Sequence, residues 1–390
     1  MRILAAMSGG VDSSVAAALL TEAGHTCIGC TMKLYKGDDS ACCSNDDVRD
    51  ARRVALLLGM PYYVFNFTED FREQVIQRFI DSYYRGETPN PCIDCNRYMK
   101  FDKLFERARQ LECEAVATGH YAQVEKQGGR YVLKKAADAS KDQSYVLYRM
   151  TQEQLAHTVF PLGALAKEHV RQIAEERGFS NAHKPDSQDI CFVPNGDYGA
   201  VIEEYTGQKS EPGFFVDSRG QGLGRHNGII RYTIGQHKGL GLALDEKRYV
   251  CRICPEDNTV VLGKNEELYS RAVWAEEVNW VEGEPPAGQF RCRVRLRYRQ
   301  PEEEARVVTD GRSLHIIFDR PQRAATPGQA AVLYDGDVVL VELGEPYTVR
   351  REDFAGKSKN TPYDGLSLYG RVACTVKAGR VTYGTMEAIG

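Results

Sequence analysis

The chain has 390 residues, a length that predicts about two to four domains. Apolar residues make up 42% and charged residues 27% of it, which is typical of a globular protein and excludes a disordered or fibrous one. The formal net charge of −4 excludes a generally basic coat for nucleic acid, so any such contact needs a local basic surface. The apolar run from Met1 to Met7 leaves no room for a signal peptide or membrane span, so we expect a cytoplasmic protein with no membrane contact.

The first 200 residues alternate short apolar strands with amphipathic helices. This order is typical of a parallel sheet with helices on both faces, so we expect an α/β, doubly wound nucleotide-binding domain over residues 1–200. The expected elements are, in chain order, strand 3–7, helix 14–22, strand 27–32, helix 46–58, strand 62–67, a helix with Phe71, Val75, Phe79 and Tyr83 four apart, strand 114–118, a hairpin at Gly128-Gly129 and helix 167–177.

The second half has a different texture. From Val201 glycine becomes frequent and helical periodicity fades, which indicates a small central α+β domain over residues 201–271. Strand alternation then returns with turn signals at Asp310-Gly311 and Asp335-Gly336, and it predicts a β-barrel over residues 272–341. Residues 342–390 are patterned separately.

A nucleotide-binding loop is predicted at Ser8-Gly9-Gly10-Val11-Asp12-Ser13, between the first strand and the first helix. Glycines let the backbone approach phosphates, the helix start attracts anions, the serines add hydroxyl donors, and Asp12 is a candidate magnesium ligand. The alternative is an ordinary strand-to-helix turn with a capping serine. The loop resembles that of the PP-loop ATP pyrophosphatases, which cleave ATP between its α and β phosphates and form adenylates.

Two loops present cysteines suited to sulfur chemistry. The proline-set segment 88–96 carries Cys92 and Cys95, and segment 186–192 carries Cys191. A thiolate is a strong nucleophile and can carry a persulfide. For the other cysteines we expect packing roles, with a structural zinc at Cys251 and Cys254 as a weaker alternative because no second ligand pair lies nearby. The packing set is Cys27, Cys30, Cys113 and Cys292, and Cys42-Cys43 stays open.

Arginines alternate with apolar residues at 291, 293, 295, 297 and 299, so a strand here would place all of them on one face. That face is either a phosphate-binding stripe or a solvated strand face balanced by Glu302, Glu303 and Glu304. The charge pattern alone leaves both open.

Together these motifs make the chain similar to the tRNA-specific 2-thiouridylase family over about residues 1–341. The matching segments are 8–13, 88–96, Ala117-Thr118-Gly119-His120-Tyr121, Lys141-Asp142-Gln143-Ser144-Tyr145, 187–192 and 232–241. The resemblance implies a tRNA-modifying transferase that adenylates C2 of the wobble uridine in tRNAs of the Lys, Glu and Gln type. Sulfur then replaces the oxygen, giving 2-thiouridine, AMP and pyrophosphate.

The resemblance also implies residue roles. Cys191 would accept sulfur as a persulfide from a donor such as a cysteine desulfurase or a sulfur relay protein, and Cys95 would attack that persulfide, leaving a disulfide bond. Asp12 would act in catalysis and hold magnesium through ATP. The implied ATP contacts are Ala6, Met7, Ser8, Gly9, Gly10, Val11, Asp12, Ser13, Met32 and Gly119. The implied tRNA contacts are Asn90, Pro91, Cys92, His120, Lys141, Asp142, Gln143, Arg297, Tyr298 and Gln329.

Cys92 departs from the family pattern, because many members have an aspartate there that is assigned a part near the target base. With Cys92, Cys95 and Cys191 together, three thiolates could instead hold a [4Fe-4S] cluster with one open iron. The persulfide and cluster routes both stay open at this point.

The last ~48 residues, 342–390, resemble the closing segment of dihydroorotase-type amidohydrolases. The carrying residues are Lys357 to Gly365, Gly370-Arg371-Val372 and Gly379-Arg380-Val381. Because no H-x-H metal pair occurs, we expect no amidohydrolase activity. Two alternatives for the whole chain are another ligase of the same loop class, which the cysteines oppose, and a zinc-binding nucleic-acid module, which would have no use for the nucleotide loop.

Overall fold

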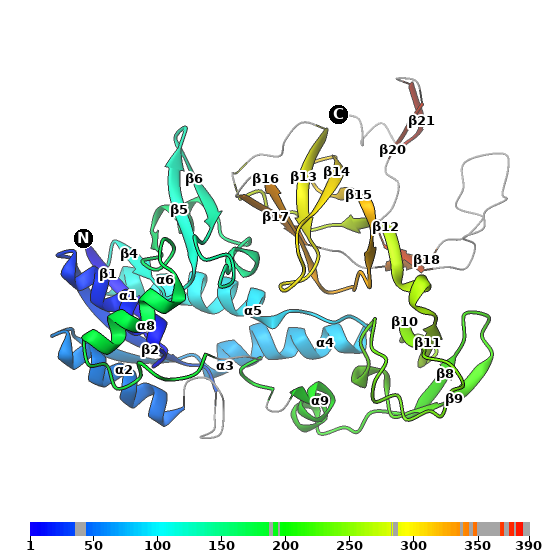
Figure 1. Cartoon of the computed structure of the whole chain (residues 1–390), viewed down its shortest axis with the longest axis horizontal. Helices are drawn as coiled ribbons and strands as arrows, with labels where there is room; N and C mark the ends of the chain where they lie inside the picture. The colour runs from blue at the N-terminus through cyan, green and yellow to red at the C-terminus, as the bar shows by residue number, and fades with distance from the viewer. Residues whose placement is uncertain are drawn as a thin grey trace.

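The computed structural model describes residues 1–35, 44–186, 190–193, 196–281, 283 and 288–335, together with strand segments 338–342, 346–348, 367–369, 374–377 and 380–384. Three segments named above lie outside these residues: Cys42-Cys43, residues 187–189 of the segment 186–192, and residues 349–366, which carry part of the dihydroorotase resemblance. Three groups of elements follow one another along the chain: a helix-rich N-terminal part, a small central part and a strand-rich C-terminal part (Figure 1).

The N-terminal part is built on a parallel sheet with strand order β3-β2-β1-β4-β7. The chain runs outward from β1 through β2 to β3 and then returns to place β4 on the other side of β1. Such a reversal opens a crevice at the carboxyl ends of the two strands that flank it, here β1 and β4. The strands are β1 (Arg2–Ala6), β2 (Thr26–Lys33), β3 (Tyr62–Asn66), β4 (Ala115–Ala117) and β7 (Thr158–Val159).

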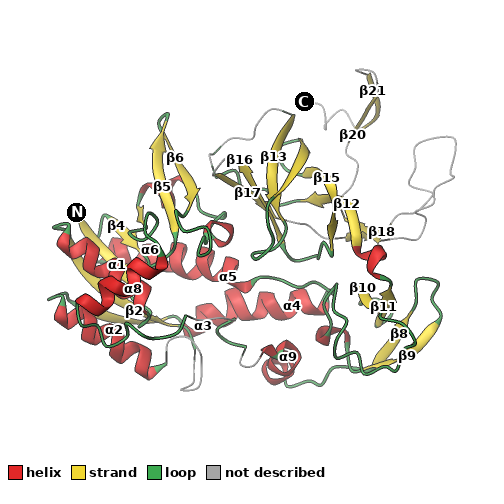
Figure 2. Cartoon of the chain, viewed as in Figure 1, coloured by secondary structure: helices red, strands yellow, loops and turns green. Residues whose placement is uncertain are grey.

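Helices cover both faces of this sheet, which confirms the doubly wound fold. Alternate residues of β1 point to opposite sides: Ile3 and Ala5 pack with one set of helices, and Leu4 packs with the other. The first set is α1 (Val11–Glu22), α2 (Asn45–Leu57) and α8 (Lys167–Glu176). The second set is α3 (Thr68–Phe71), η1 (Arg72–Gln77) and α4 (Arg78–Tyr84), followed by α5 (Pro91–Asp94), η2 (Cys95–Lys103) and α6 (Leu104–Gln110). Figure 2 shows most of the helices gathered around this sheet.

The second set forms two nearly continuous helices, 68–84 and 91–110, each with a π-helical segment in the middle. The predicted four-residue period in the first of them is confirmed, because Phe71, Val75, Phe79 and Tyr83 are all at most 3% exposed. Phe79 lies at the centre of an aromatic group, with ring centroids 4.8 Å from Tyr83 and 5.2 Å from Phe192. Helix 68–84 is therefore a core element on which other segments are anchored.

A hairpin and short helices connect β4 to α8. The predicted turn at Gly128-Gly129 is confirmed between β5 (Ala122–Gln127) and β6 (Arg130–Lys135), and η3 (Ser144–Val146) and α7 (Gln152–Ala156) follow. This region receives the C-terminal part: the Tyr145 hydroxyl donates to the Ala330 carbonyl at 2.9 Å, and Lys135 pairs with Glu302 at 2.8 Å.

The central part contains α9 (Tyr198–Thr206) and a four-stranded sheet of order β10-β11-β8-β9. Phe215, Tyr232 and Val250 lie in its small core, together with residues of β11. Short 3₁₀ helices η5 (Ile229–Arg231) and η6 (Asn265–Leu268) flank the sheet, whose strands are β8 (Gly213–Val216), β9 (Gly222–His226), β10 (Tyr249–Cys254) and β11 (Thr259–Gly263).

The C-terminal part is an antiparallel sheet of order β12-β15-β14-β13-β16-β17 around its own apolar core. Cys292 and Val294 of β13 point into that core while Arg291 and Arg293 point outward, as the alternation predicts. The strands are β12 (Tyr269–Ala275), β13 (Gln289–Arg295), β14 (Glu303–Thr309), β15 (Leu314–Arg323), β16 (Ala330–Asp335) and β17 (Val338–Glu342). Beyond them β18 (Pro346–Thr348) pairs with β19 (Ser367–Tyr369), and β20 (Cys374–Lys377) pairs with β21 (Arg380–Gly384). Of the helices within the described ranges, none has the length and apolar character needed to cross a bilayer.

Phe79→Ala should lower the free energy of unfolding by roughly 3–5 kcal/mol, because it leaves a cavity at the centre of the aromatic group. Phe214→Ala is the matched control: Phe214 is 54% exposed on β8, so the cost should stay within about 0.5 kcal/mol. Urea unfolding of the two variants measures both values. Equal costs would contradict the core role of helix 68–84.

Candidate active site

The predicted nucleotide loop lies in the crevice between the carboxyl ends of β1 and β4. Gly9 adopts a φ of +77°, and a Cβ there would lie 2.3 Å from the Asp47 carbonyl oxygen, so only glycine fits. Gly10 is the N-cap of α1, and no side chain caps the helix. The amide groups at the start of α1 are therefore left to an anionic ligand, and the helix dipole favours one there.

The serine hydroxyls of the loop make hydrogen bonds within it. The hydroxyls of Ser13 and Ser14 both donate to the Gly10 carbonyl, at 3.1 and 3.0 Å, and Ser13 also accepts from the Ser8 amide. These two hydroxyls stabilise the loop from inside, and the expectation that the serines of the Ser8–Ser13 loop donate to phosphate stays a prediction. The alternative of a turn with a capping serine is wrong, because the cap residue is Gly10.

Gly119 lies against this loop from the β4 side. A Cβ on Gly119 would be 2.7 Å from the Ser13 nitrogen and 2.9 Å from the Asp12 carbonyl carbon. Met32 lies near the carboxyl end of the adjacent strand β2 and is buried. The three backbone segments expected to meet ATP thus lie at the carboxyl ends of the neighbouring strands β1, β2 and β4, while their individual contacts with ATP stay predictions.

A buried lysine that the sequence analysis missed holds Asp12. The Lys167 ammonium, 9% exposed, donates to both Asp12 carboxylate oxygens at 2.7 and 2.8 Å, and the Tyr121 hydroxyl donates to one of them at 2.8 Å. Burial, and then the Asp12 charge, raises the pKa of Tyr121. A magnesium ion at Asp12 would have to share the carboxylate with Lys167, so the described residues around Asp12 do not form a metal site of their own, and the magnesium role stays a prediction.

Lys167 also links the loop to the segment that leads to Cys191. Its ammonium lies 2.8 Å from the Asp186 carboxylate, which pairs further with Lys141 at 2.9 Å and with Arg171 at 3.0 Å. Burial opposes the charged form, yet hydrogen bonds from Lys167 and Lys141 lower the pKa of Asp186 below its usual value. Asp186, which precedes Cys191 by five positions in the sequence, is therefore an anion held beside the nucleotide loop.

Two more residues brace the loop from behind. The Asn181 amide donates to the Gly9 carbonyl and to the Ser14 hydroxyl, both at 2.9 Å. Lys184 pairs with Asp47 at 2.6 Å and with Asp50 at 3.1 Å, and so joins the loop region to α2. Of these residues, only Lys167 could have been noticed in the sequence, because a cation in the first turn of a helix is unfavourable unless a carboxylate pairs with it. Asn181 and Lys184 carried no such signal.

The Cys92 and Cys95 loop ends in a capped helix. The Asn90 carboxamide oxygen accepts from the Cys92 amide at 3.1 Å, and Pro91 occupies the first turn of α5. Cys92 is exposed and Cys95 is partly buried at the start of η2. Asp94 lies 3.6 Å from Arg78 of α4, so the two long helices are joined next to the cysteines.

Cys191 is anchored by its neighbour Phe192. That ring is 2% exposed and packs edge-on against Phe71 and Phe79, with centroid distances of 5.8 and 5.2 Å. Helix 91–110, which carries Cys95, packs against the same helix 68–84. Among the described residues no three His, Cys, Asp or Glu side chains are grouped to bind a metal, and the cluster on Cys92, Cys95 and Cys191 stays a prediction.

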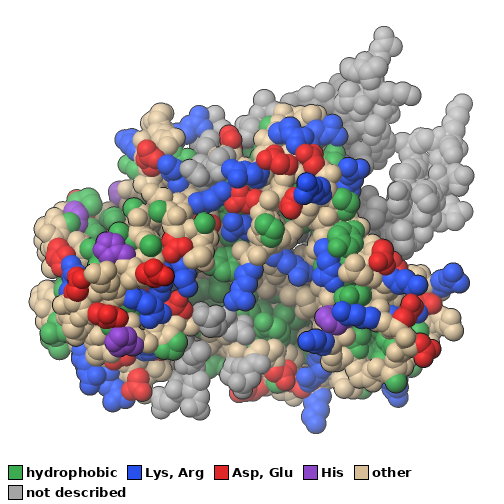
Figure 3. Space-filling model, viewed as in Figure 1, with side chains coloured by type: hydrophobic (Ala, Val, Ile, Leu, Met, Phe, Trp, Pro, Cys, Tyr) green, Lys and Arg blue, Asp and Glu red, His purple; other side chains and the backbone are tan. Residues whose placement is uncertain are grey.

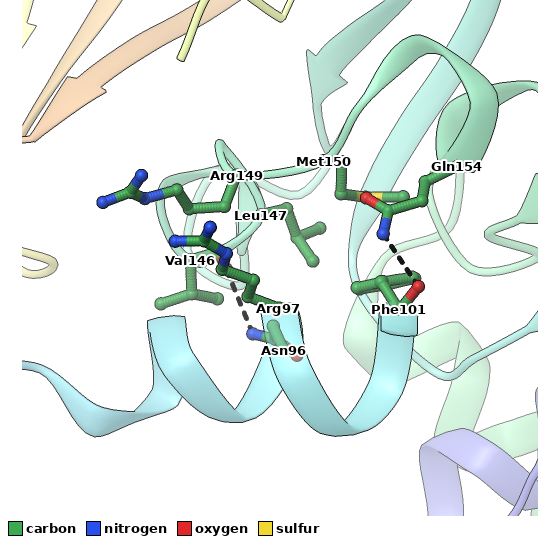
Figure 4. Close-up of a pocket in the computed structure, with 8 residues that line it drawn as sticks. All are labelled: Asn96, Arg97, Phe101, Val146, Leu147, Arg149, Met150 and Gln154. Carbon is green, nitrogen blue, oxygen red and sulfur yellow. Dashed lines mark hydrogen bonds between the residues drawn. The ribbon is translucent and has the colours of Figure 1, made fainter. Parts of the chain in front are cut away.

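A small hollow follows Cys95 along η2 (Figure 4). The Asn96 amide donates to the Val146 carbonyl at 3.1 Å, and the Gln154 amide donates to the Phe101 carbonyl at 2.8 Å. Arg97 and Arg149 extend to the same side of this hollow in Figure 4. These contacts hold η2 against the loop that contains η3, and they fix the direction in which Cys95 is presented.

Several expected tRNA contacts join parts of the protein in this structure. Arg297 donates to the Ala324 carbonyl at 2.7 Å, Gln329 donates to the Thr88 carbonyl, and the Thr88 amide donates to the Pro327 carbonyl at 2.9 Å. Burial lowers the pKa of Arg297. These hydrogen bonds hold the C-terminal part against Thr88, just before the Cys92 loop.

His120 and Asp142 are buried. The His120 imidazole lies 2.7 Å from the Thr118 hydroxyl and 3.3 Å from the Lys100 ammonium, and burial, with the Lys100 charge, holds its pKa well below the usual value. Asp142 accepts from the Ser144 hydroxyl at 2.9 Å. Their contacts with tRNA stay predictions.

Of the other expected contacts, Lys141 pairs with Asp186, Gln143 accepts from the Tyr121 amide, and the Tyr298 ring lies 5.9 Å from that of Tyr145.

The arginine stripe is not a continuous strand face, because β13 ends at Arg295. Its arginines are paired with carboxylates: Arg291 with Asp319 at 2.6 Å, and Arg295 with Glu302 at 3.0 Å and with Asp142 at 3.6 Å. Arg293 lies 3.6 Å from the same Glu302. The described strand therefore matches the alternative of a face balanced by neighbouring carboxylates, and the phosphate-binding role of these arginines stays a prediction.

Family models match three consecutive segments of the chain. Residues 1–195 match a tRNA methyl transferase HUP domain, residues 199–264 a tRNA methyl transferase PRC-barrel domain, and residues 270–341 an aminomethyltransferase beta-barrel domain. These segments coincide with the three groups of elements described above, and the last one stops within β17.

Curated relatives match over the same span. A tRNA-specific 2-thiouridylase from Clostridioides difficile is 48% identical over 347 residues, covering 87% of this chain and 96% of that protein. Proteins with the same description from Symbiobacterium thermophilum and Moorella thermoacetica are each 50% identical, covering 87% and 86% of this chain and 90% and 97% of theirs. The crevice, the two cysteine loops and the matched span agree, and the chain belongs to the tRNA-specific 2-thiouridylase family.

Proposed function

We propose that this chain is an ATP-dependent tRNA 2-thiouridylase, a sulfurtransferase that converts the C2 carbonyl of a wobble uridine into a thiocarbonyl. One observation carries the proposal furthest: a glycine loop with uncapped helix amides is joined through Lys167 and Asp186 to the segment that bears Cys191. A nucleotide site and a sulfur site joined in this way fit a reaction that activates an oxygen and then replaces it.

In the first step the C2 oxygen of uridine attacks the α-phosphorus of ATP, an oxygen–phosphorus bond forms, and pyrophosphate leaves. The amides at the start of α1 face the negative charge that builds on the phosphates. Gly9 and Gly119 have no Cβ to overlap the backbone of Asp47 and of Asp12–Ser13, so the loop can pack closely in the conformation that presents these amides. The adenylate turns a poor leaving group into AMP.

In the second step sulfur replaces that leaving group. The Cys95 thiolate attacks the inner sulfur of a persulfide on Cys191, which forms a Cys95–Cys191 disulfide and releases hydrosulfide. Hydrosulfide adds to C2, and the C2–oxygen bond breaks as AMP departs. A thiol reductant then restores the two cysteines, and a protein sulfur donor, such as a cysteine desulfurase or a sulfur relay protein, reloads Cys191.

The proposed substrates are ATP, with its accompanying magnesium, and tRNAs of the Lys, Glu and Gln type. A [4Fe-4S] cluster on Cys92, Cys95 and Cys191 is the second candidate for the sulfur carrier. Both carriers use these cysteines, and they differ in whether the active protein contains iron and labile sulfide.

Cys191→Ser and Cys95→Ser should abolish 2-thiouridine formation while leaving adenylation, because neither thiol takes part in the first step. The assay gives unmodified tRNA, ATP, magnesium and a persulfide-delivering donor to each variant, and it measures AMP, pyrophosphate and 2-thiouridine separately. Cys113→Ser, at a partly buried cysteine before β4, is the control and should retain both products. Thiolation at the wild-type rate by Cys191→Ser would contradict the mechanism.

Gly9→Ala should raise the KM for ATP by at least ~10-fold, because the added Cβ would overlap the Asp47 carbonyl and push the loop out of place. Gly24→Ala is the matched control. Gly24 has a similar φ, +81° against +77°, but a Cβ there meets nothing within 4 Å. Steady-state kinetics of pyrophosphate release compare the two. An equal effect on KM would mean that the crevice does not bind ATP.

If the persulfide route operates, active protein that has been purified anaerobically should contain no iron and no labile sulfide. About four irons and four sulfides per active chain, lost together in Cys92→Ser, would overturn that route in favour of the cluster. A persulfide on Cys191, detected by mass spectrometry of the trapped peptide, is the positive observation expected.

A further inference from the structure

A group of exposed cations surrounds one tyrosine in the central part of the chain. Tyr249 of β10 has the Lys247 ammonium and the Arg323 guanidinium each 5.2 Å from its ring centroid, and the His237 ring lies 5.4 Å away. Lys238 follows His237. We call Lys238, Lys247 and Arg323, with Tyr249 between them, the basic cluster. His237, Lys238, Lys247 and Arg323 are all exposed.

The cations of the basic cluster lack carboxylate partners. No ion pair within 4 Å involves Lys238, Lys247 or Arg323 among the residues that the structure describes, and Arg323 has only the Asn265 side-chain oxygen, at 3.1 Å. Glu246, beside Lys247 in the chain, is occupied by Arg248 at 2.9 Å and by Lys264 at 3.4 Å. Partial desolvation lowers the pKa of His237, and the charges of Lys247, Lys238 and Arg323 lower it further. The positive charge of the cluster therefore acts on the neighbouring imidazole.

This is the reverse of the situation on β13, where sequence pattern had suggested a phosphate-binding surface. There Arg291 and Arg295 are neutralised by Asp319 and Glu302. A phosphate that binds a paired arginine must compete with a carboxylate, whereas one that binds the basic cluster displaces only water and counterions. In a chain of net charge −4, a concentrated uncompensated positive group is a candidate for an anionic partner.

The basic cluster is held at the junction of the three parts of the molecule. The Gly235 amide donates to the Val250 carbonyl at 2.8 Å, next to Tyr249, and the Thr88 hydroxyl lies 3.4 Å from that of Thr233. A Cβ on Gly235, whose φ is +90°, would lie 3.1 Å from the Ala324 Cβ, beside Arg323. The cluster therefore rests on the same backbone that leads from Thr88 to the Cys92 loop.

The view in Figure 3 shows a hollow between the parts of the molecule, with hydrophobic side chains on its floor and Lys and Arg side chains along its sides. An RNA whose wobble base reaches the cysteines would have to run across such a hollow, with its backbone on both sides of the extruded base. Positive side chains away from the reacting base fix register on the backbone without reading sequence.

We propose that the basic cluster is a binding site for backbone phosphates of the substrate tRNA. The inference rests on the proposed function and adds a surface to it: Lys238, Lys247 and Arg323 contact phosphate, and Tyr249 holds two of the cations in place through cation–π contacts. Because the contacts are made to phosphate, they contribute affinity and register rather than discrimination between tRNA sequences.

The test is a triple variant, Lys238→Gln, Lys247→Gln and Arg323→Gln, in the full chain. Fluorescence anisotropy measures the Kd for unmodified tRNA over a series of salt concentrations. We expect weaker binding by roughly 10–100-fold at low salt, and the slope of log K against log salt should decrease in magnitude by about 3, about one for each phosphate that the variant no longer neutralises. The KM for ATP should not change, because none of the three residues borders the nucleotide crevice.

The matched control removes three charges that are already paired. Arg49, Arg53 and Arg109 are exposed and lie against Asp46, Asp50 and Glu153. Arg49→Gln, Arg53→Gln and Arg109→Gln together change the net charge by the same amount but should leave the salt slope within about 0.5 of wild type, since paired arginines release few counterions. Urea unfolding of both triple variants confirms that each is folded.

Two outcomes would overturn the proposal. If the cluster variant keeps the wild-type Kd and slope, or if the control variant loses as much, the cluster is not a phosphate site. If tRNA binding and sulfide-driven thiolation are unchanged but thiolation with a protein sulfur donor is lost, the cluster docks the donor instead. Failure of the wild-type protein to form 2-thiouridine at all would refute the proposed function, while the comparison of tRNA Kd values would still decide the role of the cluster.

Discussion

The site depends on one buried cation. The Lys167 ammonium lies between the Asp12 and Asp186 carboxylates, so removing Lys167 would leave the Asp12 carboxylate without its cation and would break the link between the two carboxylates. This constraint joins the start of α1, the start of α8 and the approach to Cys191, although they are far apart in sequence. Lys141 and Arg171 complete the charge balance around Asp186, so the position of the cysteine-bearing segment and that of the nucleotide loop are set together.

The C-terminal sheet has its own core and also docks on the hairpin region and on Thr88, which precedes the Cys92 loop. Its docking contacts are polar and specific: Tyr145 with Ala330, Gln329 with Thr88, and Lys135 with Glu302. Residues that the family resemblance assigns to tRNA therefore also hold the domains together. Arg297 is partly buried and has such a structural role, because it donates to the Ala324 carbonyl.

Charge pairing distinguishes basic residues that stabilise the fold from basic residues that are proposed to bind an anion. On β13 a conspicuous run of arginines is neutralised by Glu302 and Asp319, while the less conspicuous Lys238, Lys247 and Arg323 come together from separate segments without carboxylate partners in the described structure. Counting basic residues along a strand finds the first group. Whether either group can bind an anionic ligand depends on which carboxylates lie near it in the folded protein, and the sequence does not show this.

Local pattern alone determined most of the fold and the outline of the site. Periods of two and near four residues placed the strands, helix 68–84 and the hairpin, because side-chain burial follows backbone geometry directly. The Ser8–Ser13 loop was recognisable because glycine, helix start and strand end must adjoin. What only the tertiary structure decided was pairing: that Lys167 meets Asp12 and Asp186, that Ser13 and Ser14 bond inward to Gly10, and that the β13 arginines are neutralised. A side chain's charge is written in the sequence, but its partner depends on which distant segments the packed core brings within hydrogen-bonding distance.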